Sequence, residues 1–205
     1  MKYSTKKIIN VLLIFLFFFS FASTSLFADE ISEIRTMTKE KVDLVINTLR
    51  DESLSKEEKK ERILTTIDGL FDFSLMARLS LGKKHWKSLS KAGRKEFSEL
   101  FVERLKQSYL DKLDLYTDEE VVVGDAKLTK KNRVEVLTYL DSKDDKKEMT
   151  YKLYKTKKKG WMVYDVDVLG VSIVQTYRSQ FSGILKKESL EELIERLRSL
   201  GELGS

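Results

Sequence analysis

Asp165 and Asp167 are the side chains whose spacing in this sequence comes nearest to supporting catalysis. They alternate with apolar neighbours, which is typical of a β-strand, so both carboxylates would lie on one face beside Tyr164. Two carboxylates in different environments can divide the roles of general acid and general base. We favour a structural role, either on a solvated sheet face or as a hydrogen bond from Asp165 to a neighbouring turn. A hydrolase or isomerase using Asp165 and Asp167 is the alternative.

Other catalytic groups are scarce in the sequence. His85 is the single histidine, and there is no cysteine, so the zinc sites that depend on His and Cys pairs cannot be built. His85 lies beside Trp86 in a lysine-rich segment, which indicates a surface or packing residue. The glycines are scattered singly and form no phosphate-binding loop. We therefore predict a protein without catalytic residues, metal or cofactor, and not an enzyme.

Residues 1–28 have the pattern of an export signal. A lysine-containing start is followed by an apolar run over residues 8–21, and Ala28 precedes the acidic Asp29. We expect cleavage after Ala28, with an uncleaved anchor as the alternative, because a bilayer span needs about 18 or more apolar residues. Without cysteine, a lipid-attached form of the signal is excluded. The sequence predicts a periplasmic protein whose residues 29–205 form one domain.

Most of the net positive charge belongs to that signal. The whole chain has 38 Lys and Arg against 33 Asp and Glu, for a net charge of +5. Removing residues 1–28 takes away three lysines and no acid, which leaves +2. The remaining cluster, residues 157–159, fits a hairpin tip. Nucleic-acid binding needs a clustered excess of positive charge, so we predict no nucleic-acid partner.

The period of the apolar residues changes once along the chain and then returns. Helical spacing runs through residues 31–50 and 91–115, with a capping box at Ser55 and Glu58 and a short buried segment at 71–81. Alternation typical of strands follows in four segments, 121–123, 134–140, 149–153 and 162–168, joined by short polar turns. Helical spacing resumes at Gly170, and a final helix starts at Ser189. This order predicts an α+β fold, with helices on one face of a four-stranded antiparallel sheet.

Two stretches of the sequence carry a more specific pattern than the spacing of apolar residues. Residues 71–116 contain the segment MARLSLG, Trp86 and Tyr109. Residues 161–185 contain a more specific set: Trp161, Tyr164, Asp165, Gly170, Val171, Ser172, Tyr177, Arg178 and Phe181. Both resemble the MlaC-type periplasmic phospholipid-binding proteins, also called the toluene-tolerance auxiliary family, which belong to a phospholipid ABC transport system. The chain departs from them in one extra residue between Gly82 and Trp86, and in Lys91 where a proline is usual.

The resemblance implies a shuttle that carries glycerophospholipid across the periplasm. Its partners would be an outer-membrane lipoprotein complex and the inner-membrane MCE-domain protein of an ABC transporter, and its role would be to maintain outer-membrane lipid asymmetry. The bound phospholipid would be cargo, held in an apolar cavity between the curved sheet and the helices. A third reading is a chaperone-like module that presents apolar surface to unfolded outer-membrane proteins.

The predicted lipid-binding residues follow from that cavity. On the sheet, the inner-face candidates are Val123, Val134, Val136, Tyr151, Leu153, Tyr164 and Val166. Opposite them, the candidates are Phe97, Phe101, Leu105, Tyr109, Val171 and Val174. A shift of one residue in strand register would move every strand side chain to the other face. Arg178 is a candidate for the lipid phosphate, with a structural ion pair to Asp165 as its alternative.

Overall fold

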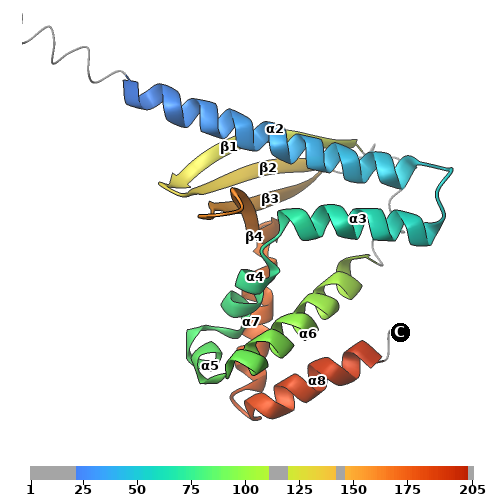
Figure 1. Ribbon diagram of the computed structural model, residues 1–205, viewed down its shortest axis with the longest axis vertical. Helices are drawn as coiled ribbons and strands as arrows, with labels where there is room; N and C mark the ends of the chain where they lie inside the picture. The colour runs from blue at the N-terminus through green and yellow to red at the C-terminus, as the bar shows by residue number, and fades with distance from the viewer. Residues whose placement is uncertain (1–21, 111–119, 142–145, 203–205) are drawn as a thin grey trace, which may run out of the picture.

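The structure is a computed structural model that describes residues 22–110, 120–141 and 146–202, with side chains over 29–108, 120–141 and 146–199. Figure 1 shows the sheet beside the long helices α2 and α3 in the upper part, with the other helices gathered below. The elements in chain order are α2 (Ala22–Arg50), α3 (Lys56–Leu70), α4 (Phe73–Leu81), α5 (Lys83–Ser88), α6 (Lys91–Leu110), β1 (Glu120–Lys130), β2 (Arg133–Asp141), β3 (Lys146–Lys155), β4 (Trp161–Val168), β5 (Val171–Ser172), α7 (Ile173–Ile184) and α8 (Leu190–Glu202).

The predicted capping boxes form at the starts of two helices. At α3, the Ser55 hydroxyl accepts from the backbone N–H of Glu58, and the Glu58 carboxylate accepts from the N–H of Ser55 at 2.8 Å. The same reciprocal pair, Ser189 and Glu192, starts α8. Each box satisfies two backbone donors that the first turn leaves without a partner. These local signals fix where the helices begin.

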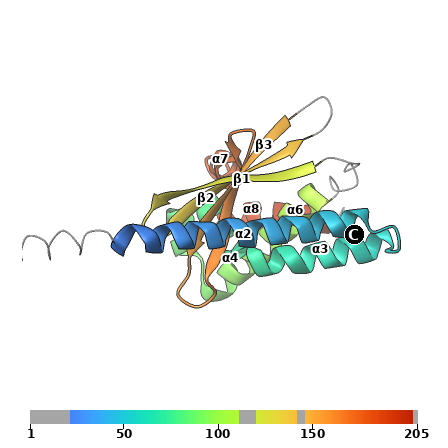
Figure 2. The same cartoon turned by 90° about the horizontal axis from the view of Figure 1, so that it is seen from above.

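The sheet confirms the predicted α+β fold with an antiparallel meander. Its order is β1-β2-β3-β4-β5, and every neighbouring pair is antiparallel. The fifth strand, of two residues, was not predicted. Register shifts interrupt the β1–β2 pairing between Val123 and Ala126 and the β3–β4 pairing between Lys152 and Leu153. Such bulges increase local twist, and the strands fan apart in Figure 2.

The bulge in β4 overturns the prediction that Tyr164 lies on the inner face. Lys152 pairs with Asp165 and Leu153 pairs with Val163, which leaves Tyr164 as the extra residue. Val163 is buried on the inner face instead. The Tyr164 ring contacts Tyr154, which follows the inward-facing Leu153 and therefore lies on the outer face. Strict alternation holds only while a strand has no inserted residue.

Among the residues with described side chains, the buried apolar ones form two clusters. The sheet cluster joins α2 to the inner face of the sheet; its buried members are Ile34, Val123, Val134, Val136, Leu153, Val163 and Val166. The helical cluster lies among α4, α6, α7 and α8; its buried members are Met76, Ala77, Leu81, Phe97, Phe101, Leu105, Val174, Phe181, Leu193, Ile194 and Leu197. Phe71 and Ile173 pack against both clusters. We call this junction the seam.

The N-terminal part of α2 contains the predicted cleavage position, but the structure does not show whether the chain is cleaved there. This helix starts at Ala22, so it includes the position after Ala28 where cleavage is expected. Across the residues the structure describes, no helix combines the length and apolar character needed to cross a membrane. Residues 1–21, with most of the predicted signal, lie outside that part. Cleavage and single-domain organisation therefore stay predictions.

Candidate functional site

The predicted lipid-binding residues divide between the two clusters. Five of the strand candidates are buried in the sheet cluster, and Tyr151 packs against it half-buried; burial raises the pKa of the Tyr151 phenol. Four of the helix candidates, Phe97, Phe101, Leu105 and Val174, are buried in the helical cluster. The two sets do not face one another across one space, because α2 packs on β1 and β2 and takes the inner face of the sheet. The spacing of apolar residues predicts which face of a strand or helix is buried, but not which element packs against that face.

Val171 was predicted to face the sheet, and this prediction is wrong. Its side chain is 60% exposed. Leu169 and Gly170 have positive φ angles of 52° and 78° and reverse the chain, so Val171 pairs with Val168 in β5. As a result α7 begins only at Ile173. Tyr109 lies in α6, but its side chain is outside the described residues.

Arg178 is exposed and does not pair with Asp165. Its guanidinium approaches the carbonyl of Leu79 at 3.5 Å and lies near Gly82, so it joins α7 to the end of α4. The alternative of a structural ion pair to Asp165 is therefore wrong, because the hydrogen-bond partner of Arg178 is a backbone carbonyl and not a carboxylate. A role toward a lipid phosphate stays untested for this side chain.

The carboxylate pair is built into the packing of β4 on α7. Asp165 is 5% exposed; it accepts hydrogen bonds from the Ser172 hydroxyl at 2.7 Å and from the backbone N–H of Val174 at 3.1 Å. Lys152 donates to Asp165 at 3.2 Å and to Asp167 at 2.6 Å. Burial lowers the pKa of Lys152, but the bonds and charges of the two aspartates outweigh it, so the net shift is upward. These bonds confirm the predicted hydrogen bonding of Asp165 to a neighbouring turn, here at the start of α7.

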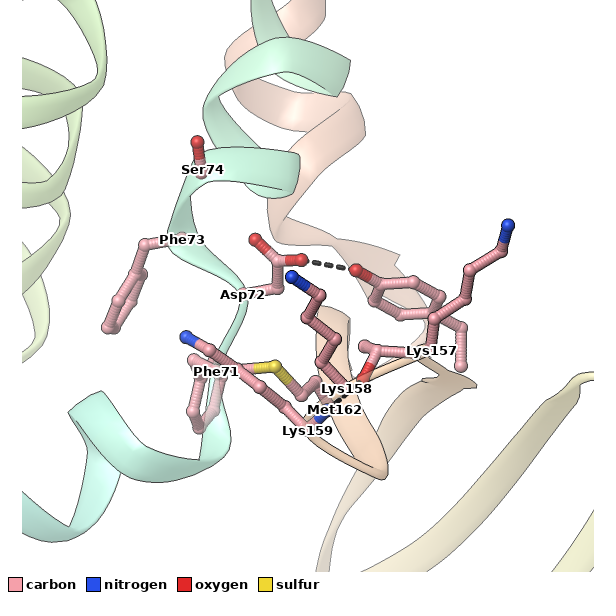
Figure 3. Close-up of a pocket in the computed structure, with 10 residues that line it drawn as sticks. Phe71, Asp72, Phe73, Ser74, Lys157, Lys158, Lys159 and Met162 are labelled. Carbon is pink, nitrogen blue, oxygen red and sulfur yellow. Dashed lines mark hydrogen bonds between the residues drawn. The ribbon is translucent and has the colours of Figure 1, made fainter. Parts of the chain in front are cut away.

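A pocket of about 450 Å³ lies where the β3–β4 hairpin meets the start of α4 (Figure 3). This volume falls in the range of small-molecule sites. Its apolar wall consists of Phe71, Phe73 and Met162, and the two phenylalanine rings stack with centroids 5.6 Å apart. Phe71 belongs to the seam, so the pocket opens beside the junction of the two clusters. The remaining lining residues are Asp72, Ser74, Tyr154, Thr156, Lys157, Lys158 and Lys159.

A hydrogen bond from Tyr154 to Asp72 fixes the polar wall of the pocket. One Asp72 oxygen accepts from the Tyr154 hydroxyl, and the other accepts from the backbone N–H of Leu75 at 2.9 Å, which caps α4. Burial, and then the hydrogen bond to Asp72, raises the pKa of Tyr154 to about 12. The phenol therefore stays a donor near neutral pH. The Asp72 carboxylate holds α4 against β3 with both of its oxygens.

This pocket combines an apolar wall with a rim of lysines, and that chemistry suits an amphiphile with a negative group. None of its lining residues was among the predicted binding residues. The sequence predicts a buried segment at 71–81 and a hairpin tip at residues 157–159, but 75 residues separate the two. The signal that could have marked the first segment is the pair Phe71 and Phe73 on either side of a potential helix cap, Asp72. Only the fold brings the two segments together.

Comparisons with known proteins agree with this architecture. A phospholipid-binding protein from Ralstonia solanacearum, solved in complex with a phospholipid, has a TM-score of 0.72 with this chain at 19% identity. The match covers 82% of this chain and 97% of that one. A domain of unknown function with a cystatin-like fold from Nostoc punctiforme matches at 18% identity over 54% of this chain and 69% of its own. Its TM-score of 0.25 is too low to indicate a shared fold. No curated protein matches the chain. The model of the MlaC protein family matches residues 39–199, so this chain belongs to the MlaC family.

Proposed function

We propose that this protein is a phospholipid carrier of the periplasm. Membership of the MlaC family supports phospholipid binding and transport as its general role. The observation that carries the proposal is the pocket at the seam, where an apolar wall meets a lysine rim. The protein would act by binding and release, as a transport protein and not as an enzyme. The phospholipid would be its cargo, with no cofactor.

The physical need for such a carrier comes from the acyl chains. Two chains contain about 30 methylene groups, and exposing each to water costs about 0.8 kcal/mol, so free crossing would cost on the order of 20 kcal/mol. In our proposal the chains enter beside Phe71 and Phe73 and extend along the seam. When the two clusters separate around an acyl chain, the contacts between the clusters are replaced by contacts between each cluster and the chain. Loading can then proceed without exposing either cluster to water.

We propose that residues 1–28 are removed on export and that the protein passes lipid between an outer-membrane lipoprotein complex and an inner-membrane MCE-domain protein of an ABC transporter. This traffic would maintain outer-membrane lipid asymmetry. Fractionation and N-terminal sequencing test the first part, with a periplasmic chain beginning at Asp29 as the expected result. Recovery of the full-length chain in the membrane fraction would contradict it.

Native mass spectrometry of the purified protein tests lipid binding directly. We expect about one phospholipid per chain after purification, or after incubation with vesicles of phosphatidylethanolamine and phosphatidylglycerol. Phe73→Asp should abolish loading, because it places a carboxylate on the apolar wall. The fold should tolerate this change, because Phe73 is the first residue of α4 and acidic side chains are favourable in a first helical turn.

Val171→Asp is the matched control for this variant. It also replaces an apolar side chain with a carboxylate, but Val171 is exposed and does not line the pocket. Loading should therefore stay at the level of the unmodified protein. The proposal fails if the unmodified protein carries no lipid under either condition. It also fails if Phe73→Asp loads normally while circular dichroism shows an intact fold.

A further inference from the structure

The β3–β4 hairpin holds a short lysine run at the mouth of the pocket. Its tip is ordered by the backbone: Thr156 N–H donates to the Gly160 carbonyl at 2.8 Å, and Lys159 N–H donates to the Thr156 hydroxyl at 2.8 Å. Gly160 has a φ of 70°, a conformation that residues with a Cβ rarely adopt. The positions of the lysine backbones are therefore set before any ligand arrives.

The three lysines of the tip differ in direction. Figure 3 shows the side chains of Lys158 and Lys159 extending over the pocket toward Asp72 and Phe71, whereas Lys157 points away from it. Two other lysines near the pocket already have partners. Lys155 pairs with Glu30, and Lys106 pairs with Asp68 at 2.6 Å. Within the described part of the chain, the ammonium groups of Lys158 and Lys159 make no ion pair.

Among the described lining residues Asp72 is the acidic one, and its carboxylate offsets part of this charge. It makes no ion pair with either lysine: one oxygen accepts from the Tyr154 hydroxyl and the other from the N–H of Leu75. Two ammonium groups against one carboxylate leave the rim positive. The pocket therefore presents two ammonium groups above an apolar wall of Phe71, Phe73 and Met162. A ligand that satisfies both parts has an apolar chain with a negatively charged group at one end.

We propose that Lys158 and Lys159 form a headgroup subsite that favours phospholipids of net negative charge over zwitterionic ones. This inference rests on the proposed function and adds selectivity to it. A zwitterionic headgroup brings its own ammonium close to the two lysines, whereas an anionic headgroup offers its phosphate charge without that repulsion. Because the lysines are exposed, the preference is a modest one that salt weakens.

Competitive loading tests the subsite. The protein is equilibrated with vesicles of equimolar phosphatidylglycerol and phosphatidylethanolamine with identical acyl chains, and the bound lipid is extracted and quantified by mass spectrometry. We expect the unmodified protein to enrich phosphatidylglycerol about threefold to fivefold at low salt, in keeping with the worth of exposed charge pairs. The double variant Lys158→Ala/Lys159→Ala should return the ratio to near one, because it lowers the loading of phosphatidylglycerol more than that of phosphatidylethanolamine.

Two controls separate this subsite from general charge effects. Lys157→Ala removes a lysine of the same tip that points away from the pocket, and it should keep most of the enrichment. Lys130→Ala/Lys131→Ala removes two exposed lysines from the β1–β2 hairpin, and it should leave the ratio unchanged. Glycerol phosphate at millimolar concentration should not displace the bound lipid, because it has the phosphate but no acyl chain.

The other outcomes of competitive loading distinguish a failure of the subsite from a failure of the carrier proposal. An unchanged enrichment in Lys158→Ala/Lys159→Ala, with normal loading, overturns the subsite and leaves the carrier proposal standing. The subsite is also overturned if this variant only slows loading of both lipids equally, since the lysines would then act on the vesicle surface. Displacement by glycerol phosphate would assign the lysines to a free phosphate ligand and overturn the lipid subsite. An absence of lipid from the unmodified protein refutes the carrier proposal itself.

Discussion

The helical cluster and the sheet cluster are both well buried, yet they are built from different side chains. In the helical cluster Phe97, Phe101 and Phe181 meet largely edge to face, with Phe101 also against Tyr177 at a centroid distance of 5.2 Å. The sheet cluster consists of valines with Ile34 and Leu153. Aromatic pairs prefer particular angles and distances, whereas aliphatic side chains on a sheet pack without such directional preference. We call the helical cluster the aromatic platform and the sheet cluster the aliphatic layer.

The seam shows why this difference matters for a carrier. Phe71 and Ile173 contact both clusters, and they lie where the chain passes from α3 to α4 and from the sheet to α7. Both crossings are held by polar anchors, Asp72 at the first and Asp165 at the second. The anchors keep the platform aligned with the sheet when apolar contacts between them change. In our proposal a lipid then separates the apolar contacts of the seam while Asp72 and Asp165 keep the two parts joined.

Truncating the aromatic platform gives the largest expected effect. Phe101→Ala should lower the free energy of unfolding by about 4 kcal/mol, because it removes a fully buried ring and leaves a cavity among directional contacts. Val136→Ala, its counterpart in the sheet cluster, should cost about 2 kcal/mol. Urea denaturation followed by circular dichroism measures both. Equal losses would mean that the ring contacts of the platform add nothing to the free energy of unfolding beyond what a smaller aliphatic side chain gives.

Removing the anchor between the sheet and α7 ranks second. Asp165→Ala should cost about 2 kcal/mol, because it removes the helix cap at Ser172 and Val174 and one partner of Lys152. Asp167→Ala is the matched control, since Asp167 contacts the same lysine but is more exposed. Its cost should stay below about 1 kcal/mol. A larger loss in Asp167→Ala would show that the ion pair, and not the cap, joins the two regions.

The elements on either side of the seam could be predicted because their signals are local. The capping boxes at Ser55 and Ser189 and the four alternating strands each depend on residues a few positions apart, and all of them form. The face of Tyr164 was wrong, because an inserted residue in β4 depends on pairing with β3. Alternation by itself carries no sign of such an insertion.

The candidate site could not be predicted, because it depends on which elements become neighbours. The sequence assigned Val136 and Phe101 correctly to apolar faces, but not to separate clusters. Nothing near residue 136 indicates that α2 would cover the sheet. The pocket likewise needs the start of α4 and the β3–β4 hairpin together, and Phe71 pairs with Val163 only through an isolated parallel bridge. Contacts of this kind have no pattern within a window of sequence.

Removing the hydrogen bond from Tyr154 to Asp72 gives the smallest expected loss of stability, and this loss depends on pH. Tyr154→Phe should cost about 1 kcal/mol near neutral pH, because Asp72 loses the hydroxyl that it accepts from and α4 loses a contact to β3. Tyr139→Phe in β2 is the control, a tyrosine that does not line the pocket. Urea denaturation of the three proteins as a function of pH measures the difference.

The direction of the pH effect follows from the proton on the phenol. The pKa of Tyr154 rises from an ordinary value of 10.0 to about 12 on folding. A raised value means that the folded protein holds the proton more tightly, so the stabilisation is complete below pH 10 and is lost as pH rises toward 12. The stability gap between the unmodified protein and Tyr154→Phe should therefore be constant up to about pH 10 and narrow above it, while the gap to Tyr139→Phe changes little. A gap that stays constant to pH 12 would mean that this hydroxyl does not anchor α4, and the platform would then depend on Asp165 alone for its alignment.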